Sequence, residues 1–257
     1  SGRGVEFLRL KSAVAAKLGS GVVQGHSSGS FFIPTKSLTL VADLLPLELL
    51  LQTEVADLSL RARRHDEARL EVLRVVQDNE PGDFPAPWDE VLDLHLAVAV
   101  KAMTVDGLQG FCLFDEQGSG KTVMTIASFD VLREAGRVDA LIVVCPKSML
   151  YEWPKDLERF LPGKYQVVSL EGPPNQRHRV MLKPHDVLVL NFDAISEHLA
   201  TLAALASARK TLLVVDESFY VKNPDARRSE AVRRLRASCS MGVVLCGTPA
   251  PNSPADL

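Results

Sequence analysis

The second part of the chain alternates short apolar runs with amphipathic segments. The apolar runs are continuous in Val, Leu and Ile, which is typical of parallel strands covered on both faces. The segment at 122–136 has helical spacing, and Gly136 stands in the position of a helix stop. The pattern predicts strands at 111–114, 140–146, 165–170, 186–192, 211–217 and 241–247. This strand–helix–strand order predicts an α/β fold, a doubly wound and mainly parallel sheet with right-handed crossovers.

The first part of the chain has a different pattern. Segments 5–10 and 30–35 are strand-like around a Gly/Ser-rich connection at 19–30, and helical spacing runs over 47–76. Residues 79–90, NEPGDFPAPWDE, contain three prolines and a glycine among acids, which predicts a linker. The predicted parts are therefore a smaller mixed α+β accessory region at 1–80, a linker at 81–90 and the α/β domain at 91–257. Residues 1–90 carry no chemical motif, and other proteins are their candidate partners.

Composition and charge narrow the function classes. The net charge is −3 and the pI is about 6.1, so no global basic field attracts nucleic acid, although a local groove can still be positive. The four cysteines have no C-x-x-C spacing, which favours buried, reduced thiols. The most apolar run, residues 38–51, is too short and too interrupted to span a membrane. We expect a cytoplasmic or nucleoid protein. The excess of arginine over lysine suggests a bacterial source, and a eukaryotic one would be nuclear.

The stretch FDEQGSGKT, residues 114–122, lies at a predicted strand-to-helix turn. Gly118 and Gly120 let backbone N–H groups point at phosphate oxygens, and the helix N-terminus adds about half a positive charge. Lys121 would reach the β- and γ-phosphates, and the Thr122 hydroxyl would bind Mg²⁺. The other interpretation of this stretch alone is a glycine-rich turn that binds nothing. The predicted nucleotide contacts are Gln117, Gly118, Ser119, Gly120, Lys121 and Thr122.

A second acidic motif, TLLVVDE, ends a predicted buried strand with two carboxylates. A solvated strand exit is the alternative interpretation. In the same alternating pattern as the glycine-rich loop, however, Asp216 would bind Mg²⁺ and Glu217 would polarise the attacking water. Together the two motifs predict an ATPase that uses ATP and Mg²⁺. Its catalytic residues are Lys121, Asp216 and Glu217, and its metal ligands are Thr122 and Asp216.

Five ordered blocks make residues 92–257, about two-thirds of the chain, resemble the first RecA-like lobe of the Swi/Snf-type ATPases of helicase superfamily two. DEQGSGKT resembles the family's acid-led loop D-E-M-G-L-G-K-T, and DESFYVKN resembles D-E-A-H-x-x-K-N. LCGTPAPNSPADL resembles the L-T-G-T-P block. CPKSMLYEWPKDLERF keeps Pro146, Ser148 and Trp153 of a further block, and DVLVLNFDAIS resembles the block that usually ends in Ser-Tyr-Glu.

This resemblance implies a RecA-like P-loop fold and an ATP-driven motor that moves along double-stranded DNA. The second RecA-like lobe, which carries the family's arginine fingers, is not in these 257 residues. Because such arginines contribute about 10³–10⁵-fold to turnover, we expect the chain alone to bind nucleotide and hydrolyse little of it. The candidate contacts to the DNA backbone are Lys147, Ser148, Asn191, Thr248 and Pro249.

The sequence also departs from the family pattern. Leu96 stands where the adenine-reading block has glutamine, and Ser218 and Phe219 replace the alanine and histidine of D-E-A-H. These departures leave a non-catalytic, nucleotide-responsive scaffold as an alternative function. An RNA helicase of the wider superfamily is a third, over which the acid-led loop and the Lys222–Asn223 pair favour the Swi/Snf type. The arginine-rich stretch at 226–236 is predicted to be a solvated helix.

Overall fold

The structure is a computed structural model that describes residues 12–17, 24–26, 30–32 and 53–247. The chain divides into two compact units, residues 1–70 and 71–257. In the first unit, residues 12–17 are helical, β1 (Gln24–His26) pairs antiparallel with β2 (Ser30–Phe32), and the long helix α4 (Thr53–Gln77) begins. The predicted strand at 5–10, the start of the predicted helix at 47–52, and the candidate DNA contacts Thr248 and Pro249 lie outside the described residues.

Strand β1 corrects one prediction of the sequence analysis. Its three residues lie inside the Gly/Ser-rich stretch that was predicted to be an irregular connection. The ladder with β2 is made by backbone groups, from Gln24 opposite Phe32 to His26 opposite Ser30. Backbone pairing needs no apolar pattern, so the side chains of this stretch carried no strand signal.

The second unit contains a six-stranded, fully parallel sheet in the order β3-β8-β7-β4-β6-β5. All six strands predicted from apolar runs are present, within one or two residues of the expected ends. The strands are β3 (Gly110–Phe114), β4 (Ala140–Cys145), β5 (Val167–Ser169), β6 (Val187–Asn191), β7 (Thr211–Val215) and β8 (Met241–Cys246).

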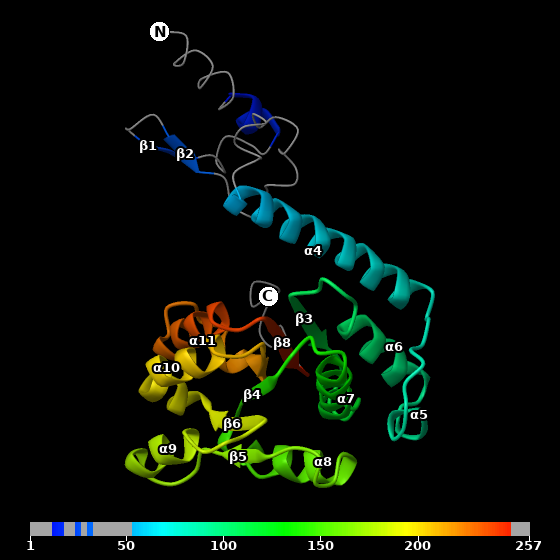
Figure 1. Ribbon diagram of the computed structural model, residues 1–257, viewed down its shortest axis with the longest axis vertical. Coiled ribbons are helices and arrows are strands. Elements are labelled where there is room, and N and C mark those ends of the chain that lie inside the picture. The colour runs from blue at the N-terminus through cyan, green and yellow to red at the C-terminus, as the bar shows by residue number, and fades with distance from the viewer. Residues whose placement is uncertain (1–11, 18–23, 27–29, 33–52, 248–257) are drawn as a thin grey trace. The chain divides into compact units, whose positions relative to one another are not determined.

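Helices cover this sheet on both faces, which confirms the predicted doubly wound α/β fold. Helix α7 leads from β3 towards β4, whereas α10 and α11 lead back towards β7 and β8, so right-handed crossovers put them on opposite faces (Figure 1). The helices of this unit are α5 (Trp88–Val91), α6 (Leu94–Met103), α7 (Lys121–Glu134), α8 (Glu152–Phe160), α9 (Pro174–Met181), α10 (Phe192–Ser207) and α11 (Arg227–Ala237), with short 3₁₀ turns η3 (Lys147–Met149) and η4 (Ser218–Val221). Among the described residues, no helix combines the length and apolar character needed to cross a bilayer.

Burial along the central strands explains why their apolar runs are unbroken. Every residue of β4, β6 and β7 is buried. Alternate residues such as Ile142 and Val144 join one core cluster with side chains of α10 and α11. Leu141 and Val143 alternate with them on β4, and both are fully buried as well. A polar residue at either set of positions would lose its water without gaining a partner.

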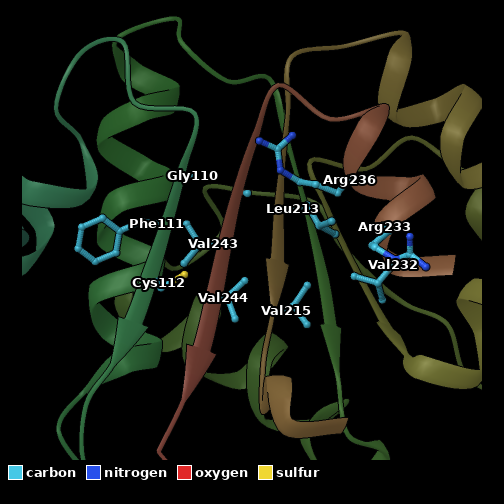
Figure 2. Close-up of a pocket in the computed structure, with 11 residues that line it drawn as sticks. Gly110, Phe111, Cys112, Leu213, Val215, Val232, Arg233, Arg236, Val243 and Val244 are labelled. Carbon is cyan, nitrogen blue, oxygen red and sulfur yellow. The ribbon is translucent and has the colours of Figure 1, made fainter. Parts of the chain in front are cut away.

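One apolar groove remains on the face that α11 covers. Side chains of β3, β8 and β7 form its floor, and α11 forms its side, as Figure 2 shows. The Arg236 guanidinium at this groove donates hydrogen bonds to the backbone carbonyls of Cys239 and Gln109, at 3.0 and 2.7 Å. Arg236 therefore ties α11 to the chain segments that lead into β8 and β3.

A buried carboxylate anchors the region before the sheet. Asp130, in α7, accepts hydrogen bonds from Trp88 Nε1 at 2.7 Å and from the Tyr165 hydroxyl at 2.5 Å, and Lys164 Nζ lies 2.6 Å away. Trp88 is 1% exposed, although the sequence analysis counted it with the linker at 81–90. Burial, and then the hydrogen bond to Asp130, raise the pKa of Tyr165, so its hydroxyl remains a donor. The carboxylate thus joins three chain segments.

Tyr165→Phe tests this anchor. We expect a loss of about 1.5–3 kcal/mol in the free energy of unfolding, because a buried carboxylate loses one donor. Urea unfolding curves of wild type and variant measure the difference. Tyr151→Phe is the matched control, since Tyr151 is 69% exposed, and we expect it to change stability by less than about 0.5 kcal/mol. Equal stability of the Tyr165→Phe variant and the wild type would show that the anchor contributes nothing.

Candidate active site

The glycine-rich loop connects β3 to the first turn of α7. Gly118 and Gly120 have φ values of +81° and +87°, in the left-handed region that other residues rarely adopt. A Cβ atom at Gly120 would also lie 2.8 Å from Leu96 Cδ2, whereas a Cβ at Gly118 would meet no heavy atom within 4 Å. The loop therefore requires glycine for its conformation at both positions, and at Gly120 a side chain would also press against Leu96. It leaves its backbone open in front of a helix N-terminus, which is a favourable place for an anion.

The side chains of this loop suit phosphate. Lys121 begins α7, and its Nζ donates hydrogen bonds to the carbonyl oxygens of Asp115 and Glu116, at 2.9 and 2.6 Å. The ammonium group is thus held over the loop. The Ser119 hydroxyl is buried and has no hydrogen-bond partner among the described residues. Thr122 follows in the same first turn and is partly buried. An ammonium, a free hydroxyl and open N–H groups are donors that fit phosphate oxygens.

Two acidic residues follow β7 at the same edge of the sheet. Asp216 is 8% exposed, and both of its oxygens have donors. Trp153 Nε1 donates to Oδ2 at 3.0 Å, and the Glu217 backbone N–H donates to Oδ1 at 2.9 Å. Glu217 itself has φ +52° and ψ +56°, a left-handed conformation that costs a non-glycine residue about 1–3 kcal/mol. Such strain is typical of functional positions.

Burial determines the electrostatics of this pair. Burial raises the pKa of Asp216 above its usual 3.8, against the opposing effects of its two N–H donors and the Lys121 charge. Burial and then the Asp216 charge raise the pKa of Glu217, and Lys121 lowers it. The Cys145 thiol is close enough to Asp216 to respond to its charge. Burial is the larger cause and the Asp216 charge the smaller one, and together they raise the pKa of Cys145 to about 12. Lys121 therefore acts on both carboxyl groups, although they lie far from it in the sequence.

The carboxylates and the Thr122 hydroxyl are hard oxygen donors, which suit Mg²⁺. In the part of the chain that the structure describes, no group of three or more His, Cys, Asp or Glu residues could hold a metal ion by itself. Mg²⁺ normally needs only one or two protein carboxylates, because waters and substrate phosphates complete its shell. The residues present therefore fit a Mg²⁺ ion that is bound together with phosphate.

The structure also brings the end of β8 to the loop. A Cβ atom at Gly247 would lie 2.8 Å from Gln117 Cγ, so the glycine of the LCGTP motif makes room for the loop. Leu96 stands at the position where the family's adenine-reading block has glutamine. Its side chain packs against Gly120 and adds no polar group to the site. The neighbouring His95, which the sequence analysis did not select, places Nε2 3.3 Å from the Ser119 carbonyl oxygen.

The described candidate DNA contacts, Lys147, Ser148 and Asn191, lie at the carboxyl ends of β4 and β6 rather than in the glycine-rich loop. Lys147 and Ser148 belong to η3, directly after β4. Lys147 is 72% exposed, and its Nζ lies 3.3 Å from Asp193 Oδ2. Asn191 is buried and lies directly before α10, where its side-chain oxygen accepts hydrogen bonds from the N–H groups of Asp193 and Ala194. Asn191 therefore has a structural role as a helix cap.

A surface hollow joins Lys147 and Asn191 to Tyr220, in the turn η4 that follows the acidic pair. Arg228, in α11, lines it, and its guanidinium lies 5.8 Å above the Tyr220 ring. Tyr220 in turn stacks on Phe219, with ring centroids 4.5 Å apart. Helical spacing alone predicts a solvated helix at 226–236, because it does not show which arginine faces a neighbouring loop. The hollow is lined by Cys145, Pro146, Lys147, Asn191, Phe192, Asp193, Tyr220 and Arg228.

Curated relatives match the chain over somewhat more than half of its length. The ATP-dependent helicase fft1 of Schizosaccharomyces pombe is 28% identical over 174 residues, which are 62% of this chain and 18% of that protein. The rice protein named "Probable chromatin-remodeling complex ATPase chain" (Oryza sativa subsp. japonica) is 30% identical over 154 residues, 58% of this chain and 13% of that protein. The mouse (Mus musculus) DNA annealing helicase and endonuclease ZRANB3 is 29% identical over 150 residues, 58% of this chain and 14% of that protein. These relatives are eukaryotic and give no support to a bacterial source, and the chain spans less than a fifth of their length.

The solved structure of the Sulfolobus solfataricus SWI2/SNF2 ATPase core in complex with dsDNA has the same fold. It superposes with a TM-score of 0.52 at 23% identity, over 69% of this chain and 35% of that chain. The SNF2-related domain family matches residues 58–257, which include the phosphate loop and the acidic pair. The chain therefore belongs to the SNF2-related family, the Swi/Snf-type ATPases of helicase superfamily two.

Proposed function

We propose that the chain binds ATP with Mg²⁺ and is the ATP-binding lobe of a motor that moves along double-stranded DNA. The observation that carries the proposal is the convergence of the phosphate loop and the acidic pair. The Lys121 charge acts on the carboxyl groups of both Asp216 and Glu217. A cation beside two partly desolvated carboxylates, in front of an open glycine loop, suits a metal-bound triphosphate.

Each residue of the site has a defined role in this proposal. The loop N–H groups at 117–120 and Lys121 hold the phosphates, and Thr122 with Asp216 would hold Mg²⁺. The bound ion supplies charge neutralisation on the phosphate oxygens. Glu217 orients the attacking water and accepts its proton, a task that its raised pKa favours. Hydrolysis by the chain alone stays slow, because no arginine from a second lobe completes the site.

The hollow beside η3 supports the DNA part of the proposal. Lys147 and Ser148 follow the carboxyl end of β4, and Arg228 lines the same hollow. Exposed cations at this edge would neutralise backbone phosphates whatever the base sequence. The SWI2/SNF2 core that shares this fold was solved with double-stranded DNA. Movement along DNA would follow from ATP-dependent closure of the two lobes of the whole protein.

One observation favours a second candidate, a nucleotide-responsive scaffold without turnover. Phe219 stands in the histidine position of D-E-A-H, and its ring stacks on Tyr220, so the position offers no hydrogen bond for coupling hydrolysis to movement. Turnover of the full-length protein separates the candidates. The scaffold predicts ATP binding without hydrolysis, whereas the motor predicts hydrolysis that duplex DNA stimulates. Stimulation by duplex RNA alone would instead indicate an RNA helicase.

Lys121→Ala tests the nucleotide site. We expect ATP to bind about 10–150-fold more weakly, because the loss of a charged donor to phosphate costs about 1.5–3 kcal/mol. Calorimetric titration of the chain with Mg·ATP measures the change. Lys155→Ala is the control: Lys155 is 60% exposed on α8 and pairs with Glu152. Unchanged affinity in Lys121→Ala would contradict the proposed role of the loop.

The same chain tests the expected dependence on a second lobe. We expect residues 1–257 to bind ATP but turn over at least ~10³-fold more slowly than the full-length protein with DNA. A phosphate-release assay compares the two. Robust hydrolysis by residues 1–257 that Lys121→Ala abolishes would overturn this part of the proposal.

Lys147→Ala tests the DNA contact in the full-length protein. We expect weaker binding to duplexes of any sequence, and a slope of log affinity against log salt that is shallower by about 1. Fluorescence anisotropy at several salt concentrations measures both quantities. Lys183→Ala is the control, since Lys183 is exposed and precedes β6, at the opposite edge of the sheet. An equal salt slope in wild type and Lys147→Ala would exclude Lys147 from the DNA interface.

A further inference from the structure

We propose that Trp153 is a positioning residue for the metal ligand Asp216, and that it connects the segment after β4 to the metal site. This inference rests on the proposed function, in which Asp216 binds Mg²⁺. In the sequence, Trp153 is part of a block that resembles the family pattern, and no role for it follows from that resemblance. In the structure its indole is fully buried, and its Nε1 donates to Asp216 Oδ2 at 3.0 Å.

The hydrogen bonds of Asp216 leave room for a metal ion. Each carboxylate oxygen has two lone pairs, and one donor occupies each oxygen: the indole on Oδ2 and the Glu217 N–H on Oδ1. The carboxylate plane is therefore held at both ends, while lone pairs remain for ligation. An indole N–H is a donor only, so it orients the carboxylate and cannot itself be a metal ligand. Outer partners of this kind orient metal ligands and determine metal affinity.

Both long-range partners of Asp216 come from one short stretch of chain. Its backbone N–H donates to the Val144 carbonyl at 2.8 Å, and its side chain accepts from Trp153. Between these two residues lies η3, with Lys147 and Ser148. Trp153 is the second residue of α8, the helix that follows η3 in the chain, so the indole belongs to the same short stretch as η3. The stretch 144–153 thus makes both of these hydrogen bonds to the proposed metal ligand, and it also contains two of the candidate DNA contacts.

The chain offers a matched control for this interaction. It contains two tryptophans, and Trp88 is 1% exposed, with its Nε1 2.7 Å from Asp130 Oδ2. Each tryptophan is therefore a buried indole that donates to a buried aspartate. Asp130, however, lies nine residues beyond Lys121 in α7, outside the phosphate loop and the acidic pair. Replacing Trp88 removes the same kind of hydrogen bond without touching the proposed metal ligand.

Trp153→Phe and Trp88→Phe are compared by Mg²⁺ titration of the chain with a fluorescent ATP analogue. For Trp153→Phe we expect the Mg²⁺ concentration at half-maximal binding to rise about 10–100-fold. Binding of the analogue in EDTA should not change, because the phosphate loop is intact. Trp88→Phe should keep the wild-type Mg²⁺ midpoint while losing a similar amount of stability in urea unfolding. A midpoint that is unchanged in Trp153→Phe, or that moves equally in Trp88→Phe, would overturn the inference.

A second measurement needs no change at Trp153. In the Trp88→Phe chain, Trp153 is the remaining tryptophan, and its emission reports the surroundings of Asp216. We expect Mg²⁺ with ATP to shift this emission, ATP in EDTA to leave it unchanged, and an added Asp216→Asn substitution to abolish the shift. Equal emission with and without Mg²⁺, in a chain that binds ATP, would overturn the inference alone. Failure of the wild-type chain to bind ATP under any condition would overturn the proposed function, and the inference with it.

Discussion

The direction of the six strands is the constraint on which the site depends. Because all of them are parallel, every carboxyl end lies at one edge of the sheet, and the segments that follow β3, β4, β6, β7 and β8 start there. The phosphate loop follows β3 and the acidic pair follows β7, with β8 between them. Close approach at this edge leaves little space, so Gly247 at the end of β8 has no side chain beside Gln117.

Desolvation of the acidic pair then determines what the site can bind. Two neighbouring carboxylates that lose water repel each other, and burial raises the pKa of each. Two N–H donors and the Lys121 ammonium oppose this effect at Asp216 but do not outweigh it. An uncompensated buried ion costs several kcal/mol. A divalent cation would relieve that cost, so the unfavourable electrostatics of the pair and its suitability for a metal have the same origin.

The hollow beside β4 and β6 is built from the segments that follow the same edge. Aromatic rings connect it to the acidic motif, since Tyr220 lies between Phe219 and Phe192, at ring distances of 4.5 and 5.3 Å. Arg228 lies over Tyr220, the middle ring of this group. Where the family motif has a histidine, this chain therefore has a stacked aromatic cluster. The stacked rings offer no hydrogen bond at this position, whereas Trp153 makes a direct polar contact with Asp216.

The sequence by itself determined the six strands of the sheet and the positions of the glycine-rich loop and the acidic pair. Each of these depends on local spacing: unbroken apolar runs, glycines before a lysine, or carboxylates after a strand. It did not predict the hydrogen bond between Trp153 and Asp216, which are 63 residues apart, or the one between Trp88 and Asp130, which are 42 residues apart. Nor did it predict Arg228 beside Tyr220, or the backbone ladder of β1. These contacts depend on the order of strands and on which helix covers which face. Residue periodicity encodes burial along one element and not the identity of its neighbours, so only the tertiary structure could decide them.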